Sequence, residues 1–75
     1  SQGKIIAEGN QNIKDLFREF NLNLPESESS TIGGYIMDKA KKIPLYGEII
    51  EDAYFRYKIT SHSRKQILRL EISKI

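Results

Sequence analysis

The sequence predicts a small α+β domain with the element order β-α-α-β-β-β. Apolar residues recur three and four positions apart within residues 13–20 and 32–41, which is the spacing of an amphipathic helix. Within residues 53–60 and 66–73 they instead alternate with polar residues, as on a strand with one buried face. Short turn segments join the last three strands and favour an antiparallel meander. We therefore expect a small antiparallel-type sheet with two helices on one face.

The size and composition limit what the chain can contain. A chain of 75 residues makes one domain near the lower size limit for folding on its own core. It has no cysteine, which excludes a disulfide framework and a thiolate metal site. No apolar run approaches the ~20 residues that cross a bilayer. We expect a soluble segment, with no direct membrane insertion and no room for an enclosed cofactor.

The net charge of +2 is unevenly distributed along the chain. Residues 1–38 carry three basic and six acidic side chains, whereas residues 39–75 carry nine basic and four acidic ones. A basic half can face nucleic acid, an anionic membrane surface or an acidic partner. It can equally be a solvated sheet face, and the alternation of basic with apolar residues favours this second interpretation.

The first two elements are a strand over Lys4–Glu8, closed by Gly9-Asn10, and a helix over residues 13–20. Asn12 is placed to cap the helix through its side-chain oxygen. The apolar stripe of this helix comprises Ile13, Leu16, Phe17 and Phe20. After it we expect Leu22 and Leu24 to pack under the sheet, followed by an acidic loop over residues 26–30.

The second helix, from Ile32 to Lys41, opens on two glycines. Thr31 can cap it, but Gly33 and Gly34 each cost about 1 kcal/mol relative to alanine. One explanation is close backbone approach to another element of the domain. The other is a ligand at the helix N-terminus, where free N–H groups could hold a phosphate of FAD or an adenine nucleotide. The packing explanation is favoured, with Thr31, Gly33 and Gly34 as candidate cofactor-binding residues in the alternative.

The segment after the second helix contains the turn into the sheet. Asp38 and Lys42 stand four residues apart and can form a weak ion pair. Pro44 prevents the helix from continuing, and Gly47 allows a turn into a strand over residues 48–51.

The last two strands are predicted by their alternation. On the strand over residues 53–60, one face carries Phe55, Tyr57 and Ile59. On the strand over residues 66–73 we expect a buried face made by Leu68, Leu70 and Ile72, and an outward face made by Ile67, Arg69, Glu71 and Ser73.

No catalytic constellation is visible in the sequence. His62 is the only histidine and lies in a predicted turn without the partner that acid–base chemistry needs. Glu26 and Glu28 are too few carboxylates for a calcium or magnesium cage. Nucleic acid binding by the outward face is a weak third hypothesis, since any solvated sheet face shows the same pattern.

Several motifs together identify a known family. The strand-then-glycine segment Lys4–Gly9 and the helix Ile13–Phe20 are followed by Thr31-x-Gly-Gly. Next come Ile43-Pro44-x-x-Gly-Glu and a final strand ending in Arg69-Leu-Glu-Ile. In this order the chain resembles the CorC/HlyC-type transporter-associated domain over nearly its whole length. Tyr35, where an aliphatic residue is more typical, and the absence of glycine at residues 51–53 are departures from the family pattern.

The resemblance implies a non-catalytic accessory domain of a bacterial haemolysin-like or magnesium and cobalt efflux-type membrane protein. Such a domain would be the C-terminal part of a longer chain, at the cytoplasmic face of the inner membrane. Its partners would be the CBS and membrane domains of that chain, or a second copy in a homodimer, and not nucleic acid. The fold is similar to a subdomain of FAD-binding oxidases, but fold analogy transfers no site. We expect no cofactor in the isolated domain.

The expected function is modulation of ion transport through contacts with other domains. The polar sheet face and the turn at residues 44–48 are the expected contact surfaces, because tyrosine is enriched at protein interfaces. The candidate interaction residues are Tyr46, Glu48, Tyr54, Arg56 and Lys58.

Overall fold

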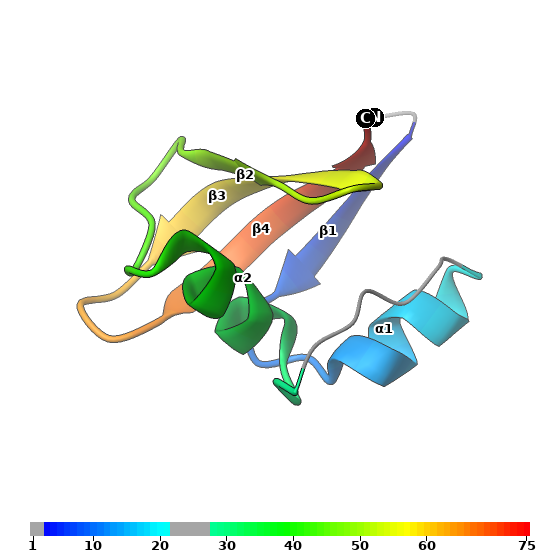
Figure 1. Ribbon diagram of the computed structural model, residues 1–75, viewed down its shortest axis with the longest axis horizontal. Coiled ribbons are helices and arrows are strands. Elements are labelled where there is room, and N and C mark those ends of the chain that lie inside the picture. The colour runs from blue at the N-terminus through cyan, green and yellow to red at the C-terminus, as the bar shows by residue number, and fades with distance from the viewer. Residues whose placement is uncertain (1–2, 22–27) are drawn as a thin grey trace.

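A computed structural model describes residues 3–21 and 28–75 of the chain (Figure 1). The expected segment Leu22–Leu24 and residues 26–27 of the acidic loop after it lie outside the described residues. The elements, in chain order, are β1 (Lys4–Glu8), α1 (Ile13–Glu19), α2 (Ile32–Ala40), β2 (Ile49–Glu51), β3 (Phe55–His62) and β4 (Ile67–Lys74). The predicted order β-α-α-β-β-β is therefore confirmed.

The four strands form one antiparallel sheet in the order β1-β4-β3-β2. The last three strands are a meander, as predicted, and β1 returns to pair with β4, with Ala7 opposite Leu70. Consequently β3 and β4 lie at the centre of the sheet, and β1 and the three-residue β2 form its edges. In Figure 1 helix α2 crosses in front of this sheet, and α1 lies beyond the end of β1 that leads into it.

One face of the sheet carries the core. Side chains from both helices and from three strands form a single buried cluster: Ala7, Ile13, Leu16, Phe17, Ile32, Tyr35, Ile36, Phe55, Tyr57, Ile59, Ile67, Leu70 and Ile72. Helix α1 joins it through Phe17, whose ring meets Phe55 edge-to-face at 5.6 Å between centroids. Such aromatic pairs add to the stabilisation given by burial alone. Both helices therefore cover the same face of the sheet, as expected.

Helix α1 begins as predicted and ends one residue earlier. The Asn12 side chain accepts a hydrogen bond from the backbone N–H of Asp15 at 3.0 Å, which satisfies a donor that has no partner within the helix. The helix ends at Glu19, and Phe20 is its C-cap with 46% of its surface exposed. The expectation that Phe20 belongs to the buried stripe is therefore wrong, because the helical spacing stops before it.

The prediction for the buried face of β4 is wrong at its first two residues and correct beyond them. Ile67 is buried and Leu68 is 41% exposed, the reverse of the expectation, whereas Leu70 and Ile72 are buried as expected. The cause is an irregularity in the β3–β4 ladder, where the pairing shifts between Ile59 and His62. A bulge inserts an unpaired residue and reverses the faces beyond it, and the alternation in the sequence does not reveal it.

Helix α2 ends at Ala40, and Lys41 follows it in the left-handed conformation with φ of 62°. This turn takes Lys42 off the helix, and its ammonium bonds to Glu48 at 2.9 Å. The predicted pairing of Lys42 with Asp38 is replaced by this contact. In the part of the chain that the structure describes, no helix has the length and apolar character needed to span a bilayer.

Candidate functional site

The first turn of α2 is the one place where the sequence suggested a ligand. Its backbone donors are all used within the chain. The N–H of Ile32 donates to Gln11 O at 3.1 Å, and the N–H of Gly33 donates to Gly9 O at 2.8 Å. The Thr31 hydroxyl accepts from the N–H of Gly34 at 3.1 Å, as the predicted cap. A phosphate would have to displace these bonds to reach the helix N-terminus.

The two helix glycines have different environments. A Cβ built on Gly33 would lie 2.7 Å from the carbonyl oxygen of Gly9, whereas one on Gly34 would meet side-chain atoms, the Thr31 hydroxyl at 3.0 Å and Ser29 Cβ at 3.6 Å. Gly9 is itself pressed against β4, since a Cβ there would lie 1.9 Å from Ile67 O. Close backbone approach, the explanation favoured from the sequence, therefore accounts for Gly33. The geometry of the helix start gives no support to the flavin or nucleotide alternative.

The turn at residues 44–48 is held by its own hydrogen bonds. Glu48 N–H donates to Leu45 O at 3.0 Å, and the Glu48 carboxylate bonds Lys42 at 2.9 Å. Gly47 has φ of +84°, the positive value that the third residue of a type II turn requires. The hydrogen bond from Lys42, with that from the Leu45 N–H, holds the pKa of Glu48 below its usual value. Glu48 thus supports the turn, and Tyr46, 71% exposed, stands at its tip.

Replacing Glu48 by glutamine tests how much this ion pair contributes. Because the pair is solvent-exposed, we expect the melting temperature to fall by less than about 5 °C. The difference from the wild type should shrink between about 0.05 M and about 0.5 M salt, since salt screens exposed charges. Thermal unfolding followed by circular dichroism measures both. A larger, salt-independent loss would contradict the assignment of Glu48 to an exposed ion pair, because the glutamine oxygen can still accept from the Leu45 N–H.

The five predicted interaction residues do not lie on one patch. Tyr46 and Glu48 belong to the turn before β2, which bonds to Ile59 in the middle of β3, while Tyr54 lies in the β2–β3 turn just before β3 begins at Phe55. From Ile59 to Phe55 is about 13 Å of strand, at 3.3 Å per residue. Arg56 and Lys58 are exposed on the side of β3 that faces away from the helices. The sequence could not show this division, because it depends on which way the β2–β3 hairpin folds.

The face of the sheet opposite the helices is open among the described residues. Across it, Lys58 of β3 pairs in register with Ile49 of β2 and Glu71 of β4, and Glu71 with Ile6 of β1. Ile6 is 67% and Ile49 51% exposed. Ion pairs flank this row, Lys4 with Glu71 at 3.8 Å and Arg56 with Glu51 at 2.7 Å. We call this surface the open sheet face.

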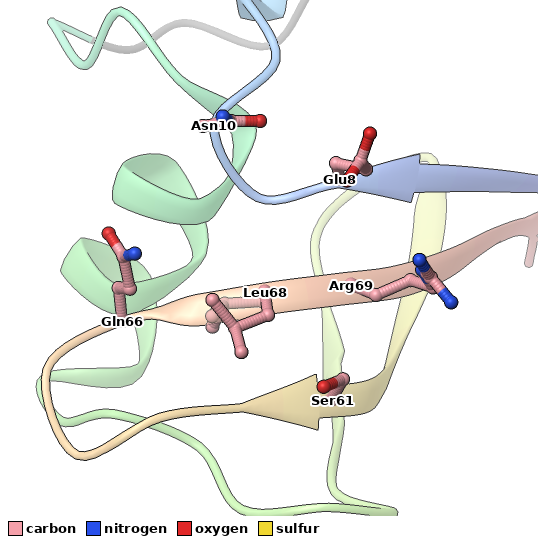
Figure 2. A pocket seen from close by; sticks show the side chains of 7 residues that line it. Glu8, Asn10, Ser61, Gln66, Leu68 and Arg69 are labelled. Carbon is pink, nitrogen blue, oxygen red and sulfur yellow. The ribbon is translucent and has the colours of Figure 1, made fainter.

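A shallow pocket lies at the bulged end of the sheet. It encloses about 350 Å³ and is lined mainly by the ends of β1, β3 and β4 (Figure 2). Glu8 and Arg69 bring opposite charges to it, and Leu68 lies at its wall. A pocket with both signs of charge has no net field to favour an anion or a cation. Its chemistry therefore points to no ligand class.

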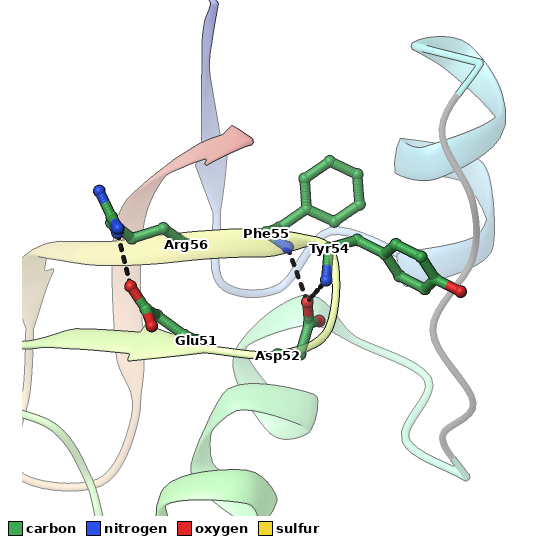
Figure 3. Close-up of polar contacts among 5 residues, drawn as sticks. All are labelled: Glu51, Asp52, Tyr54, Phe55 and Arg56. Carbon is green, nitrogen blue, oxygen red and sulfur yellow. Dashed lines mark hydrogen bonds and ion pairs between the residues drawn. The ribbon is translucent and has the colours of Figure 1, made fainter. Parts of the chain in front are cut away.

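Among the described residues, Asp52 has the largest number of side-chain hydrogen bonds, and the sequence patterns did not single it out. One carboxylate oxygen accepts from the backbone N–H groups of Tyr54 at 2.9 Å and Phe55 at 2.8 Å (Figure 3). The other accepts from the hydroxyls of Tyr35 at 2.7 Å and Tyr57 at 2.5 Å. It therefore ties helix α2 to β3. The signal that could have revealed it is an aspartate at a bend, a typical Asx turn.

The electrostatics of this cluster follow from burial and hydrogen bonding. Partial burial raises the pKa of the Asp52 carboxyl, but the bonds from Tyr57, the Tyr54 N–H, Tyr35 and the Phe55 N–H outweigh it. The pKa of Asp52 therefore lies below its usual value and the group is ionised at neutral pH. Burial, then the bond to Asp52, raises the pKa of both Tyr35 and Tyr57. Since all four donors are satisfied, the cluster is structural.

The other described residues that could take part in catalysis or bind a metal ion are not grouped into a site. The Nδ1 of His62 lies 3.2 Å from the carbonyl oxygen of its neighbour Ser63. Within residues 3–21 and 28–75, no group of three or more histidine, cysteine, aspartate or glutamate side chains is placed to hold a metal ion.

The comparisons with known proteins agree with the resemblance in the motifs. A family model described as "Transporter associated domain", CorC_HlyC, matches residues 1–75. The chain belongs to the CorC_HlyC family. A magnesium and cobalt efflux protein CorC of Buchnera aphidicola is 30% identical over 73 residues, which are 97% of this chain and 26% of that protein. The CorC_HlyC domain thus spans about a quarter of that relative's length.

Solved structures share the fold of this CorC_HlyC domain. One is the transporter-associated domain of a Xylella fastidiosa haemolysin in complex with Mg²⁺ and Mn²⁺. Its TM-score is 0.81 at 21% identity, with 100% of this chain and 91% of that chain covered. Another is the transporter-associated domain from a CBS domain protein of Porphyromonas gingivalis. Its TM-score is 0.82 at 21% identity, with 97% and 90% covered. At these identities the likeness shows the common α+β fold.

Proposed function

We propose that this CorC_HlyC domain is a non-catalytic accessory part of a cation-efflux-type membrane protein. In this proposal it is one segment of a longer chain and modulates transport by docking on neighbouring parts of that chain, CBS domains among them, at the cytoplasmic side. The names of the relatives support the setting: one is an efflux protein and another a CBS domain protein. The geometry supports a docking role rather than a catalytic one. The polar groups at the start of α2, in the turn at residues 44–48 and around Asp52 already have hydrogen-bond partners within the domain.

The observation that carries the proposal is the open sheet face. Both helices cover the other face, so side chains such as Ile6 and Ile49 remain exposed in its middle row. Lys58 and Glu71 lie between them, and with Lys4, which is 3.8 Å from Glu71, they give this face charges of both signs. Exposed apolar residues rimmed by charged ones are typical of a protein interface. A second copy of the domain docking on this face is the alternative occupant.

The proposal gives the domain no metal of its own. The Xylella domain was solved with Mg²⁺ and Mn²⁺, but the described residues of this chain contain no cluster of potential ligands. In this proposal the transported cation acts elsewhere in the parent protein.

The test is a paired substitution on the open sheet face in the full-length protein. Ile6→Glu with Ile49→Glu places two charges where a partner would bury apolar surface, and burying an unpaired charge is costly. We expect cells that depend on this protein to lose cobalt tolerance, as they would after deletion of the domain. The isolated double variant should keep its melting temperature within a few degrees, since both sites are exposed.

The matched control is Lys14→Glu with Arg18→Glu on the exposed side of α1. It introduces charges on a surface outside the proposal and should leave tolerance unchanged. Wild-type tolerance after Ile6→Glu with Ile49→Glu, or after removal of the whole domain, would contradict the proposal. Sedimentation of the isolated domain distinguishes the alternative: a dimer that the double variant dissociates would assign the face to self-association.

A further inference from the structure

Two turns and a helix end meet at the side of the domain away from the start of β1 and the end of β4 (Figure 1). Helix α2 ends there, and the chain passes through the turn at residues 44–48. The β3–β4 turn lies beside it, because Ile43 and Leu45 line one groove with His62, Ser63 and Arg64. Backbone bonds join the turn at residues 44–48 to the middle of β3, with Gly47 N–H donating to Ile59 O at 2.8 Å and Ile59 N–H to Glu48 O at 2.9 Å.

Positive charge gathers on these segments. Their exposed basic side chains are Lys39, Lys41, Lys42, Arg64 and Lys65, which we call the basic end. Over residues 38–48 and 62–66 the acidic side chains are Asp38 and Glu48, and Glu48 is already paired with Lys42. The basic end therefore has a larger positive excess than the whole chain, whose net charge is +2.

Two large apolar side chains stand among these cations. Leu45 is 58% and Tyr46 71% exposed, at the tip of a turn that Gly47 and Glu48 hold rigid. The backbone of the neighbouring tip, which carries Arg64 and Lys65, is held in the same way. The Ser63 hydroxyl accepts from the N–H of Lys65, and Ser63 N–H donates to Gln66 O at 2.8 Å. Both tips are thus preorganised, which lowers the entropy lost when they bind a surface.

We propose that the basic end rests on the anionic surface of the membrane, with Leu45 and Tyr46 at the headgroup level and the basic side chains around them on lipid phosphates. Aromatic and aliphatic side chains surrounded by lysine and arginine are the pattern of interfacial binding. No span enters the bilayer in this arrangement. The proposal rests on the proposed function only for the presence of a membrane within reach of the domain.

The arrangement favours a lipid surface over an acidic protein segment. The cations come from two separate segments, the end of α2 and the β3–β4 turn, so they match a plane of many equivalent phosphates. The groove beside Leu45 is lined by residues in and next to the two turns, whereas an extended peptide binds along a free strand edge. The open sheet face stays free for the docking proposed above.

The experiment measures binding of the 75-residue chain to vesicles by co-sedimentation. Vesicles of equimolar phosphatidylglycerol and phosphatidylcholine should bind it, and phosphatidylcholine vesicles much less. Each cation near such a surface contributes about fivefold in affinity, so Lys41→Gln with Arg64→Gln and Lys65→Gln should weaken binding by about 100-fold. Raising salt from about 0.05 M to about 0.5 M should abolish it. The charge-matched control, Lys14→Gln with Arg18→Gln and Lys74→Gln, should bind like the wild type.

A second measurement tests the apolar tip. The chain has no tryptophan, so Tyr46→Trp introduces a single probe at an exposed position. Its fluorescence should shift to shorter wavelength with anionic vesicles, as an indole entering the headgroup region does. Tyr54→Trp, on the β2–β3 turn and 54% exposed before substitution, should not shift.

Three results would overturn the proposal. The first is equal binding to anionic and neutral vesicles, or none to either. The second is equal weakening by the control triple variant, which would indicate diffuse attraction by net charge. The third is binding to polyglutamate but not to vesicles, with the same dependence on Lys41, Arg64 and Lys65; this would assign the basic end to an acidic protein partner. The cobalt-tolerance test uses other residues, so either proposal can fail alone.

Discussion

Substitution of Gly9 by alanine is expected to lower the melting temperature of the domain by more than about 10 °C. A Cβ at this position would lie 1.9 Å from the carbonyl oxygen of Ile67. Since that oxygen belongs to the backbone of β4, no side-chain rotation can relieve the clash. Moving the chain would strain two bonds, from Gly9 N–H to Leu68 O at 3.0 Å and from Gly33 N–H to Gly9 O at 2.8 Å. A cost of about 3 kcal/mol corresponds to that shift in a domain of this size.

The other glycines of this contact make a graded series. Gly33→Ala, with its Cβ 2.7 Å from Gly9 O, should lose less than Gly9→Ala. Gly34→Ala meets side-chain atoms rather than backbone, with the Thr31 hydroxyl nearest at 3.0 Å. It also gains helix propensity of up to about 1 kcal/mol, so it should be nearly neutral. Thermal unfolding of the three variants followed by circular dichroism measures the order. A melting temperature of Gly9→Ala within a few degrees of the wild type would show that the β1–β4–α2 contact is not tightly packed.

This contact illustrates what sequence reasoning could and could not give. The cost of two glycines at a helix start indicated that a backbone or a ligand comes close, and packing was the favoured explanation. The partner could not be named, because Gly9 lies 24 positions earlier and meets Gly33 only when β1 pairs with β4. Local sequence patterns predict the helices and strands, but they do not predict which distant residue a given residue will contact.

The same limit applies to the faces of the sheet. Alternation placed Phe55, Tyr57 and Ile59 in the core correctly, because β3 is regular at those positions. It failed at Ile67 and Leu68, where the bulge is a property of two paired strands. The predicted interaction residues fall on separate surfaces for a similar reason. Tyr46 and Tyr54 are eight residues apart in the sequence but lie at opposite ends of a hairpin.

Replacement of Asp52 by alanine is the second change for which we expect a large effect, a loss of about 3 kcal/mol and on the order of 10–20 °C in melting temperature. It removes the acceptor of four hydrogen bonds, two from backbone N–H groups and two from the hydroxyls of Tyr35 and Tyr57. Donors left without partners in a partly buried place keep their cost of desolvation. Asp52→Asn should lose less, because the amide oxygen can still accept from Tyr54 and Phe55. Glu51→Gln, an exposed neighbour, is the matched control.

The effect of Asp52 should also depend on pH. Its pKa in the folded domain lies below the ordinary value of 3.8, so the unfolded chain takes up a proton first as the pH falls. Its ionisation therefore contributes fully above about pH 5 and is lost as the pH falls below 4 through the folded pKa. The difference in stability between the wild type and Asp52→Asn should be constant from pH 8 to about pH 5 and shrink below pH 4. Urea unfolding at each pH measures it. If the two curves of unfolding free energy against pH stay parallel down to pH 3, Asp52 stabilises the domain through its hydrogen-bond geometry and not through its charge. If they converge, the negative charge of Asp52, which accepts from two tyrosine hydroxyls, stabilises the packing of α2 on the sheet.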